Sequence, residues 1–199
     1  MHGADGYQIL WPMATHTSLA NQFLIAMPTL ADPNFSRTVT FLCEHSDQGA
    51  LGLVINRTLD MALGEIFEQM DIDPATANHA DARIYQGGPV QSDHGFVLHE
   101  PLGSWQSTLP ITDTLGLSTS QDILYAIAED RGPDNWLVAL GYAGWGPGQL
   151  EQEMSDNSWL HGPADSSIVF HLPIEQRWQA AAQKLGVDLS TLSGDAGHA

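Results

Sequence analysis

The sequence predicts a single domain of the α+β class, in which strands form most of the core and helices lie among them. The chain has 199 residues, of which 43% are hydrophobic, and this is enough for one domain with a substantial core. Apolar runs typical of strands outnumber segments with helical periodicity, and the two kinds do not alternate as in a regular βαβ winding. No repeat, linker or change of composition divides the chain.

The first half of the chain is predicted to be mostly strands. Residues 21–28 are an apolar run that ends at a proline, and we predict that this run forms a strand. Residues 38–45 and 50–56 are two further runs around a short polar loop, which predicts a β-hairpin. Gly52 lies inside the second of these runs, where a glycine indicates a bulge or a close approach of backbone. Residues 61–70 have apolar side chains at helical spacing and are predicted to form a helix.

The second half mixes short strands with helices. One helix is predicted over residues 121–129, with Ser120 as its cap. The last helix is predicted over residues 174–185, and Gly186 is a natural stop for it. Short strands or apolar pieces are expected at residues 83–90, 95–98, 108–112, 115–120, 135–140 and 167–170.

The stretch from Gly141 to Met154 is the most distinctive part of the sequence. It holds four glycines and Pro147, and it directly follows the predicted strand 135–140. Glycine at this density permits positive φ and close approach of other groups. We therefore predict a strand that ends at Leu140, a sharp packed turn, and a short helix that begins at Gln149. Such junctions hold binding sites more often than the elements around them.

The charge of the chain restricts its partners. Six Lys and Arg residues stand against 24 Asp and Glu residues, which gives a formal net charge of −18. Binding to nucleic acid or to anionic lipid depends on clustered cations, so both are disfavoured. A basic protein partner or a neutral small ligand is more compatible with this charge, although acidic residues also serve simply to keep a protein in solution.

The single cysteine and the chain ends define the expected context. Cys43 excludes an internal disulfide and fits a reducing cytoplasm. No run approaches the ~20 apolar residues of a membrane helix. We expect residues 1–12 to be a disordered extension, because Met13 is an alternative start. Residues 13–190 are then one domain, and residues 191–199 are a frayed tail.

Motifs for common chemistries are missing. The sequence has no glycine-rich nucleotide loop, no serine nucleophile elbow and no zinc-binding HExxH. Its nine histidines make no metal-ligand pattern. We therefore expect neither a cofactor nor a metal ion, and we lean toward a protein that is not an enzyme.

Cys43 and His45 are the one candidate nucleophile pair. They are two residues apart on a predicted strand, so we expect their side chains to share a face. An imidazolium beside a thiol lowers the thiol pKa and favours the reactive thiolate. The other interpretation is that the strand buries Cys43 as a small, inert hydrophobic residue.

The glycine-rich stretch offers a candidate pocket. Gln149 and Glu153 are four apart on the predicted helix and share a face, with Tyr142 and Trp145 nearby. These side chains could line a small polar and aromatic pocket. The other interpretation is that Trp145 and Trp159 are core aromatics packed beneath a tight turn.

Three groups of residues are distinctive: Leu24–Pro28, Asp32–Phe35 and Gly52–Arg57; then Gln86–Val90; then Gly141–Glu151 with Trp159. They resemble the bacterial YqgE/AlgH family, and they occur in the family's order. The resemblance covers roughly residues 15–188 and implies a cytosolic α+β domain with a strongly bent mixed sheet, part barrel-like, flanked by helices. It implies no known enzyme activity, substrate or cofactor. The family is labelled as transcriptional regulators because some members affect gene expression, and the charge of −18 favours an indirect effect here.

Two functional hypotheses follow. The first is a non-enzymatic regulatory or interaction protein that binds a protein partner or a small ligand. The second is a thiol-based redox sensor or weak nucleophilic enzyme that uses Cys43 with His45. The candidate binding surface of the first hypothesis comprises Asn56, Gly87, Gly88, Tyr142, Trp145, Gln149 and Glu153.

Overall fold

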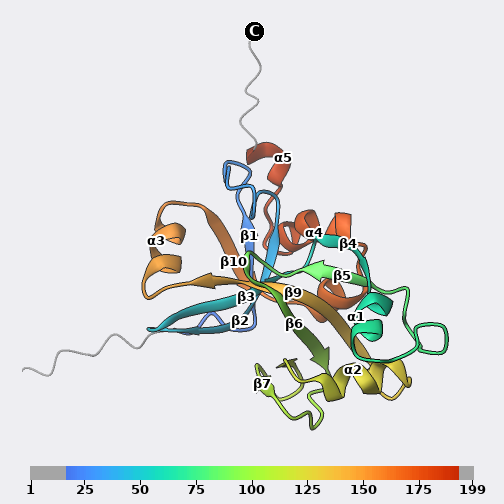
Figure 1. The fold of residues 1–199 in the computed structure, drawn as a ribbon. Helices are drawn as coiled ribbons and strands as arrows, with labels where there is room; N and C mark the ends of the chain where they lie inside the picture. Colours follow the sequence, from blue (N-terminus) through green and yellow to red (C-terminus); the bar gives the residue numbers. More distant parts are fainter. Residues whose placement is uncertain (1–16, 193–199) are drawn as a thin grey trace, which may run out of the picture.

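A curled sheet of ten strands, shaped like half a barrel, forms the centre of the molecule, and helices pack on its faces (Figure 1). The structure is a computed structural model that describes residues 17–192. The expectations for residues 1–12, and for most of the predicted tail, lie outside the described residues. The strands are β1 (Gln22–Ala26), β2 (Val39–Ser46), β3 (Gly49–Val54), β4 (Thr58–Ala62), β5 (Arg83–Gln86), β6 (Val90–Glu100), β7 (Thr108–Pro110), β8 (Gly116–Ser118), β9 (Asn135–Trp145) and β10 (Trp159–Pro163).

The helices are short and follow the predicted order. The predicted helices over 61–70, 121–129 and 174–185 are confirmed as α1, as α2, and as a 3₁₀ turn that continues into α4. Residues 167–170, expected as a short apolar piece, lie in a π-helical turn. None of the helices in the described range is long and apolar enough to cross a membrane. The bounds are α1 (Leu63–Gln69), α2 (Gln121–Ala128), α3 (Gln149–Ser155), α4 (Arg177–Lys184), α5 (Leu189–Leu192), the π-helical turn Ser167–His171 and the 3₁₀ turn Ile174–Gln176.

Strand β9 is the centre of the sheet, because three other strands pair with it. It is antiparallel to β3 and β6 and parallel to β5, so the sheet is mixed. The main order is β10-β1-β2-β3-β9-β6-β8-β7, and β4 extends the β5 side. The predicted hairpin of residues 38–45 and 50–56 is confirmed as β2 and β3.

Three hydrophobic clusters form the core. The central cluster lies between the sheet and α4, the α1–α2 cluster lies beneath those two helices, and the α3 cluster lies between α3 and the β1–β2 end of the sheet. Representative members are Phe41, Cys43, Leu98 and Ala139 in the central cluster; Leu63, Phe67, Ile123 and Val138 in the α1–α2 cluster; and Leu42, Ala143, Trp145, Leu150 and Trp159 in the α3 cluster.

The prediction that the central strand ends at Leu140 was wrong. Strand β9 continues to Trp145, because residues 143–145 pair with β3. Gly141 lies in the left-handed region (φ 72°), and here it bends the strand instead of ending it. The bend also reverses the side-chain alternation: Leu140 packs on the α1–α2 cluster, whereas Tyr142 packs on the central cluster. The sharp turn is confined to residues 146–148, and α3 begins at Gln149 as predicted.

Other boundaries differ in smaller ways. Strand β6 spans residues 90–100 rather than 95–98, with a bulge between Val90 and Gly95. Gly52 does mark a close approach, since an added Cβ would lie 2.7 Å from Thr40 Cγ2. Helix α5 includes residues 191 and 192, which the sequence places in the frayed tail.

Candidate functional site

The candidate binding surface predicted from sequence does not form one site. Asn56 hydrogen-bonds to the backbone. Its Oδ1 accepts a hydrogen bond from the Val39 N–H (2.8 Å), and its Nδ2 donates to the Arg37 carbonyl (2.9 Å). Both polar ends of this side chain are therefore used within the fold.

Gly87 and Gly88 are buried, and they allow two backbone segments to touch. A Cβ on Gly87 would lie 2.2 Å from the Gly141 carbonyl oxygen, and one on Gly88 would lie 2.1 Å from the Tyr142 carbonyl carbon. The Gly87 N–H also donates to the Leu140 carbonyl (2.9 Å). The two glycines thus position β9 and present no side chain to a ligand.

Glu153 joins the aromatic residues of the glycine-rich stretch to α3. Its Oε2 accepts hydrogen bonds from the indole N–H groups of Trp145 and Trp159 (2.9 Å each), and its Oε1 accepts one from Gln149 Nε2 (3.0 Å). Phe35 packs against both indoles, with ring centroids 6.0 and 5.5 Å away. Both tryptophans are buried. This arrangement, the Glu153 network, matches the core-aromatic interpretation rather than a ligand pocket.

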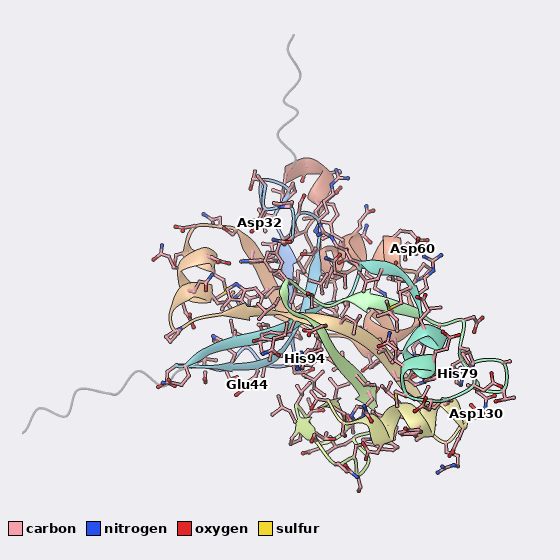
Figure 2. The ribbon with its side chains drawn as sticks, in the orientation of Figure 1. Asp32, Glu44, Asp60, His79, His94 and Asp130 are labelled. Carbon is pink, nitrogen blue, oxygen red and sulfur yellow. The ribbon has the colours of Figure 1, made fainter. Side chains whose placement is uncertain are left out.

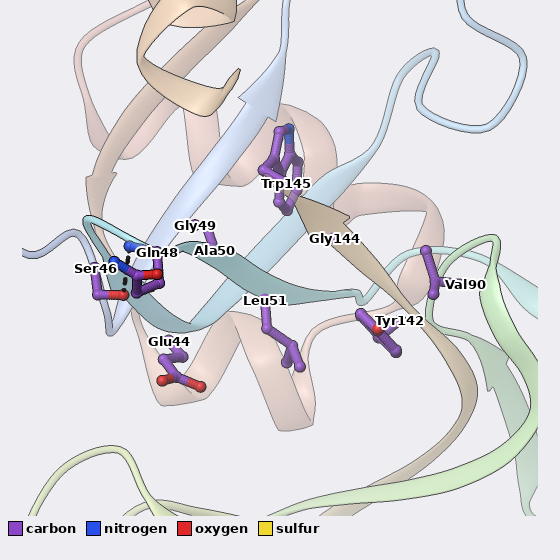
Figure 3. Close-up of a pocket in the computed structure, with 10 residues that line it drawn as sticks. All are labelled: Glu44, Ser46, Gln48, Gly49, Ala50, Leu51, Val90, Tyr142, Gly144 and Trp145. Carbon is purple, nitrogen blue, oxygen red and sulfur yellow. Dashed lines mark hydrogen bonds between the residues drawn. The ribbon is translucent and has the colours of Figure 1, made fainter. Parts of the chain in front are cut away.

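Tyr142 is the residue of the candidate surface that faces a cavity with its own side chain. A hollow of about 410 Å³, the β3–β9 hollow, lies over the hairpin on the side turned away from α3 (Figure 3). The Tyr142 ring packs edge-on against Phe96 (centroids 5.6 Å apart) and is half-buried. The other lining residues are Glu44, Ser46, Gln48, Gly49, Ala50, Leu51, Val90, Gly144 and Trp145.

Glu44 gives the β3–β9 hollow its charge. Its side chain is exposed on β2, and within the described residues it forms no ion pair. Other acids, such as Asp32, Asp60 and Asp130, lie at separate parts of the surface (Figure 2). Leu51 lies between Glu44 and Tyr142 in the hollow (Figure 3). The carboxylate can hold a cationic group by charge, and the tyrosine ring offers a separate face for a cation or an alkyl chain. Sequence reasoning missed Glu44, although an acid inside an apolar strand was a usable signal.

Cys43 and His45 do not share a face, contrary to the expectation from strand alternation. A bulge between Leu42 and Glu44 shifts the pairing of β2 with β3 at this point. The extra residue reverses the alternation. Cys43 therefore packs in the central cluster, whereas His45 points toward Leu19 and α3.

His45 has a structural role that the sequence did not indicate. Its Nδ1 accepts a hydrogen bond from the Leu19 N–H (3.0 Å), so Nε2 carries the proton of the neutral ring and donates to Glu151 Oε1 (2.8 Å). The ring is nearly buried. It thus links the segment before β1 and helix α3 to the end of β2.

Cys43 is protected from solvent, and burial raises the pKa of its thiol far above the ordinary value, with the nearby Glu44 charge adding to the shift.

We expect native Cys43 to react with iodoacetamide at least about 100-fold more slowly than Cys43 in urea-unfolded protein. Only the thiolate reacts, and the native thiol stays neutral. The rate should be measured as a function of pH, with His45→Ala as a parallel variant. Fast native alkylation with an apparent pKa below ~8.5, lost in that variant, would instead support the redox hypothesis.

The described residues give no sign of a metal centre. Within residues 17–192, no group of three or more His, Cys, Asp or Glu side chains lies in an arrangement that could hold a metal ion. The described hollow likewise has no glycine-rich phosphate loop and no lysine or arginine among its lining residues. What it offers is a carboxylate, a tyrosine and short polar side chains.

Fold and site together define a one-domain α+β protein with a half-barrel sheet and an acidic, aromatic surface hollow. The model of the family described as AlgH-like matches residues 23–190, and the chain belongs to this family. The resemblance seen in the motifs is thereby confirmed.

Relatives and solved structures match this chain over nearly its whole length. A UPF0301 protein of Thioalkalivibrio sulfidiphilus is 57% identical over 187 residues, which are 94% of this chain and 100% of that protein. The solution structure of the AlgH protein from Pseudomonas aeruginosa has a TM-score of 0.76 and 55% identity, and the match covers 95% of this chain and 100% of that one. Protein DIP2367 from Corynebacterium diphtheriae, at 21% identity and a TM-score of 0.68, covers 88% and 91% and shows the shared fold alone. None of these names states an activity.

Proposed function

We propose that this protein is a non-enzymatic regulatory protein of the cytoplasm that affects transcription indirectly, by binding a basic protein partner. The β3–β9 hollow is its binding site, and a Lys or Arg side chain of the partner is the group that enters it. The observation that carries this proposal is that the exposed carboxylate of Glu44, which forms no ion pair within residues 17–192, lines the same hollow as the half-buried Tyr142 ring.

The chemistry of the hollow supports a cation rather than an anion. No Lys or Arg lines it, so a phosphate or carboxylate would meet only like charge and neutral groups. A guanidinium or ammonium group would pair with Glu44, with Ser46 and Gln48 as further polar neighbours, while Leu51 and Tyr142 would contact the rest of the bound segment. The volume of about 410 Å³ admits one such side chain with part of its backbone.

The charge of the whole chain supports the same partner. A formal net charge of −18 attracts a basic protein over distance and repels nucleic acid. Long-range attraction of this kind raises the association rate and weakens as salt is added. The contacts within the hollow would then select the cationic side chain that binds.

The test is titration of ¹⁵N-labelled protein with a tri-arginine peptide at low and at raised salt, followed by NMR. We expect amide shifts at Leu51, Tyr142 and Gly144, and a weaker affinity at raised salt. Glu44→Gln should weaken binding about five-fold, which corresponds to the ~1 kcal/mol of an exposed ion pair.

Glu175→Gln is the matched control, because it removes one exposed charge away from the hollow. It should leave the affinity nearly unchanged. If Glu175→Gln and Glu44→Gln weaken binding equally, net charge alone accounts for the affinity and the hollow is not the site.

A further inference from the structure

A second cavity lies on the other side of β9, away from the β3–β9 hollow. It measures about 470 Å³ and opens between α1, α2 and the strands β6, β8 and β9; we name it the α1–α2 groove. Apolar side chains line one part of it, and Gln69, Asp93 and residues 118–121 line the rest. The apolar lining includes Met61, Ile66, Met70, Leu124, Val138 and Leu140.

Contacts between α1, α2 and the sheet fix the shape of the groove. The Tyr125 hydroxyl donates a hydrogen bond to the Met70 carbonyl (3.2 Å), which ties α2 to the end of α1. Beneath the floor, Phe67 and Ile123 are fully buried and anchor the two helices to the sheet. Met61 and Met70 remain partly exposed, and methionine side chains adapt readily to different apolar partners.

The rim of the groove carries two carboxylates. Asp93 lines it, is largely exposed and pairs with His94 (Oδ1 to Nδ1, 3.1 Å). Glu65 is exposed and lies one helical turn from the lining residue Gln69. Neither Lys nor Arg lines the groove, and the sequence contains none between Arg83 and Arg131. A ligand that fills the apolar part of the groove therefore meets carboxylates and neutral polar groups at its edge, and no Lys or Arg among the lining residues.

We propose that the α1–α2 groove is the docking site for a basic amphipathic helix of another protein. An apolar floor between two helices suits the side chains at positions i, i+3, i+4 and i+7 of such a helix. Lys and Arg residues at its flanks would pair with the acidic rim, which a second copy of this acidic chain would not. The groove is separate from the β3–β9 hollow and does not depend on the function proposed for it.

Gly95 provides a specific way to block the groove. It lines the groove, and it lies two residues before Val97 on the same face of β6. A Cβ built on Gly95 meets no heavy atom within 4 Å. Gly95→Leu should therefore place a side chain into the open groove, whereas Gly95→Ala should add only one methyl group.

The experiment uses a synthetic peptide of about 18 residues, roughly five helical turns, with Leu at positions i, i+3, i+4 and i+7 and Lys elsewhere. Calorimetry measures its affinity, and ¹³C-methyl NMR of Met61 and Met70 reports its place. We expect binding with shifts of both methyl groups, and Gly95→Leu should weaken it about ten-fold or more, while Gly95→Ala changes it little. Urea unfolding checks that both variants fold.

Control peptides and variants separate this result from general charge attraction. A peptide of the same composition with its Leu residues spread around the helix cannot form one apolar helical face and should bind at least about ten-fold more weakly. Glu44→Gln should leave the Leu/Lys helix peptide bound, so the two sites can fail independently. Equal affinity for both peptides, unchanged binding by Gly95→Leu, or silent methionine methyls would overturn the proposal. So would a wild-type dimer that Gly95→Leu converts to a monomer, because the groove would then be a self-interface.

Discussion

Replacing Gly141 by alanine is expected to lower the free energy of unfolding by about 3 kcal/mol or more. The residue adopts φ 72°, which costs an L-amino acid roughly 1–2 kcal/mol. The new Cβ would also lie 2.4 Å from the Gly88 carbonyl oxygen, so a backbone segment must shift, at a further ~1–3 kcal/mol. Urea unfolding followed by tryptophan fluorescence measures the change.

Gly95→Ala is the matched control for this prediction. Gly95 is also a strand glycine, but its Cβ position is open and its φ is not positive. It should be neutral or stabilise the protein by about 0.5–1 kcal/mol, because alanine loses less backbone entropy on folding. Equal losses for the two variants would mean that the left-handed bend at Gly141 is not the cause.

Replacing Glu153 by alanine is expected to cost about 2–5 kcal/mol. The substitution leaves the indole N–H groups of Trp145 and Trp159 without the carboxylate oxygen they share, and each unsatisfied buried donor costs ~1–3 kcal/mol. The Gln149 amide loses its partner as well. Urea unfolding gives the free energy, and near-UV circular dichroism reports the packing of the indoles.

Glu153→Gln separates the hydrogen bonds from the volume of the side chain. A glutamine carbonyl can still accept from both indoles, so the expected loss is only ~1 kcal/mol. If the glutamine variant is as unstable as the alanine variant, the charge of Glu153 matters more than its geometry. If both are as stable as the wild type, the Glu153 network does not hold α3.

The sequence predicted those elements whose signal is local. The hairpin of β2 and β3 follows from two β-rich runs around a short polar loop, and α1 and α2 follow from apolar side chains at helical spacing. In each case the residues that determine the structure lie within a few positions of one another.

The errors arise where distant segments decide the local structure. Strand β9 continues past Gly141 because β3, some 90 residues earlier, offers its edge to residues 143–145. Cys43 and His45 separate because the pairing with β3 shifts between Leu42 and Glu44. Neither the bend at Gly141 nor the bulge in β2 has a periodic signature in the sequence. Simple alternation along the strand therefore placed the side chains of Cys43 and His45 on the same face.

The candidate site was only partly predictable for the same reason. Tyr142 and Trp145 do line the β3–β9 hollow, but Gln149 and Glu153 lie on the α3 side, and Asn56 is used elsewhere. Glu44 enters the hollow only because the bulge turns it to the side of Leu51 and Tyr142. The α1–α2 groove needs α1, α2 and β9 together, which are separated by long stretches of chain.

The central place of β9 has a consequence for how the chain folds during synthesis. Until residues 135–145 have left the ribosome, the edges of β3, β5 and β6 that pair with β9 have no hydrogen-bonding partner. The edge of β1 that pairs with β10 has none until residues 159–163 are made. Sheets that close through such distant pairings fold slowly, and nascent chains with exposed strand edges are prone to aggregate. The chain must therefore be synthesised as far as residue 145 before β3, β5 and β6 can pair with β9, and as far as residue 163 before β1 can pair with β10.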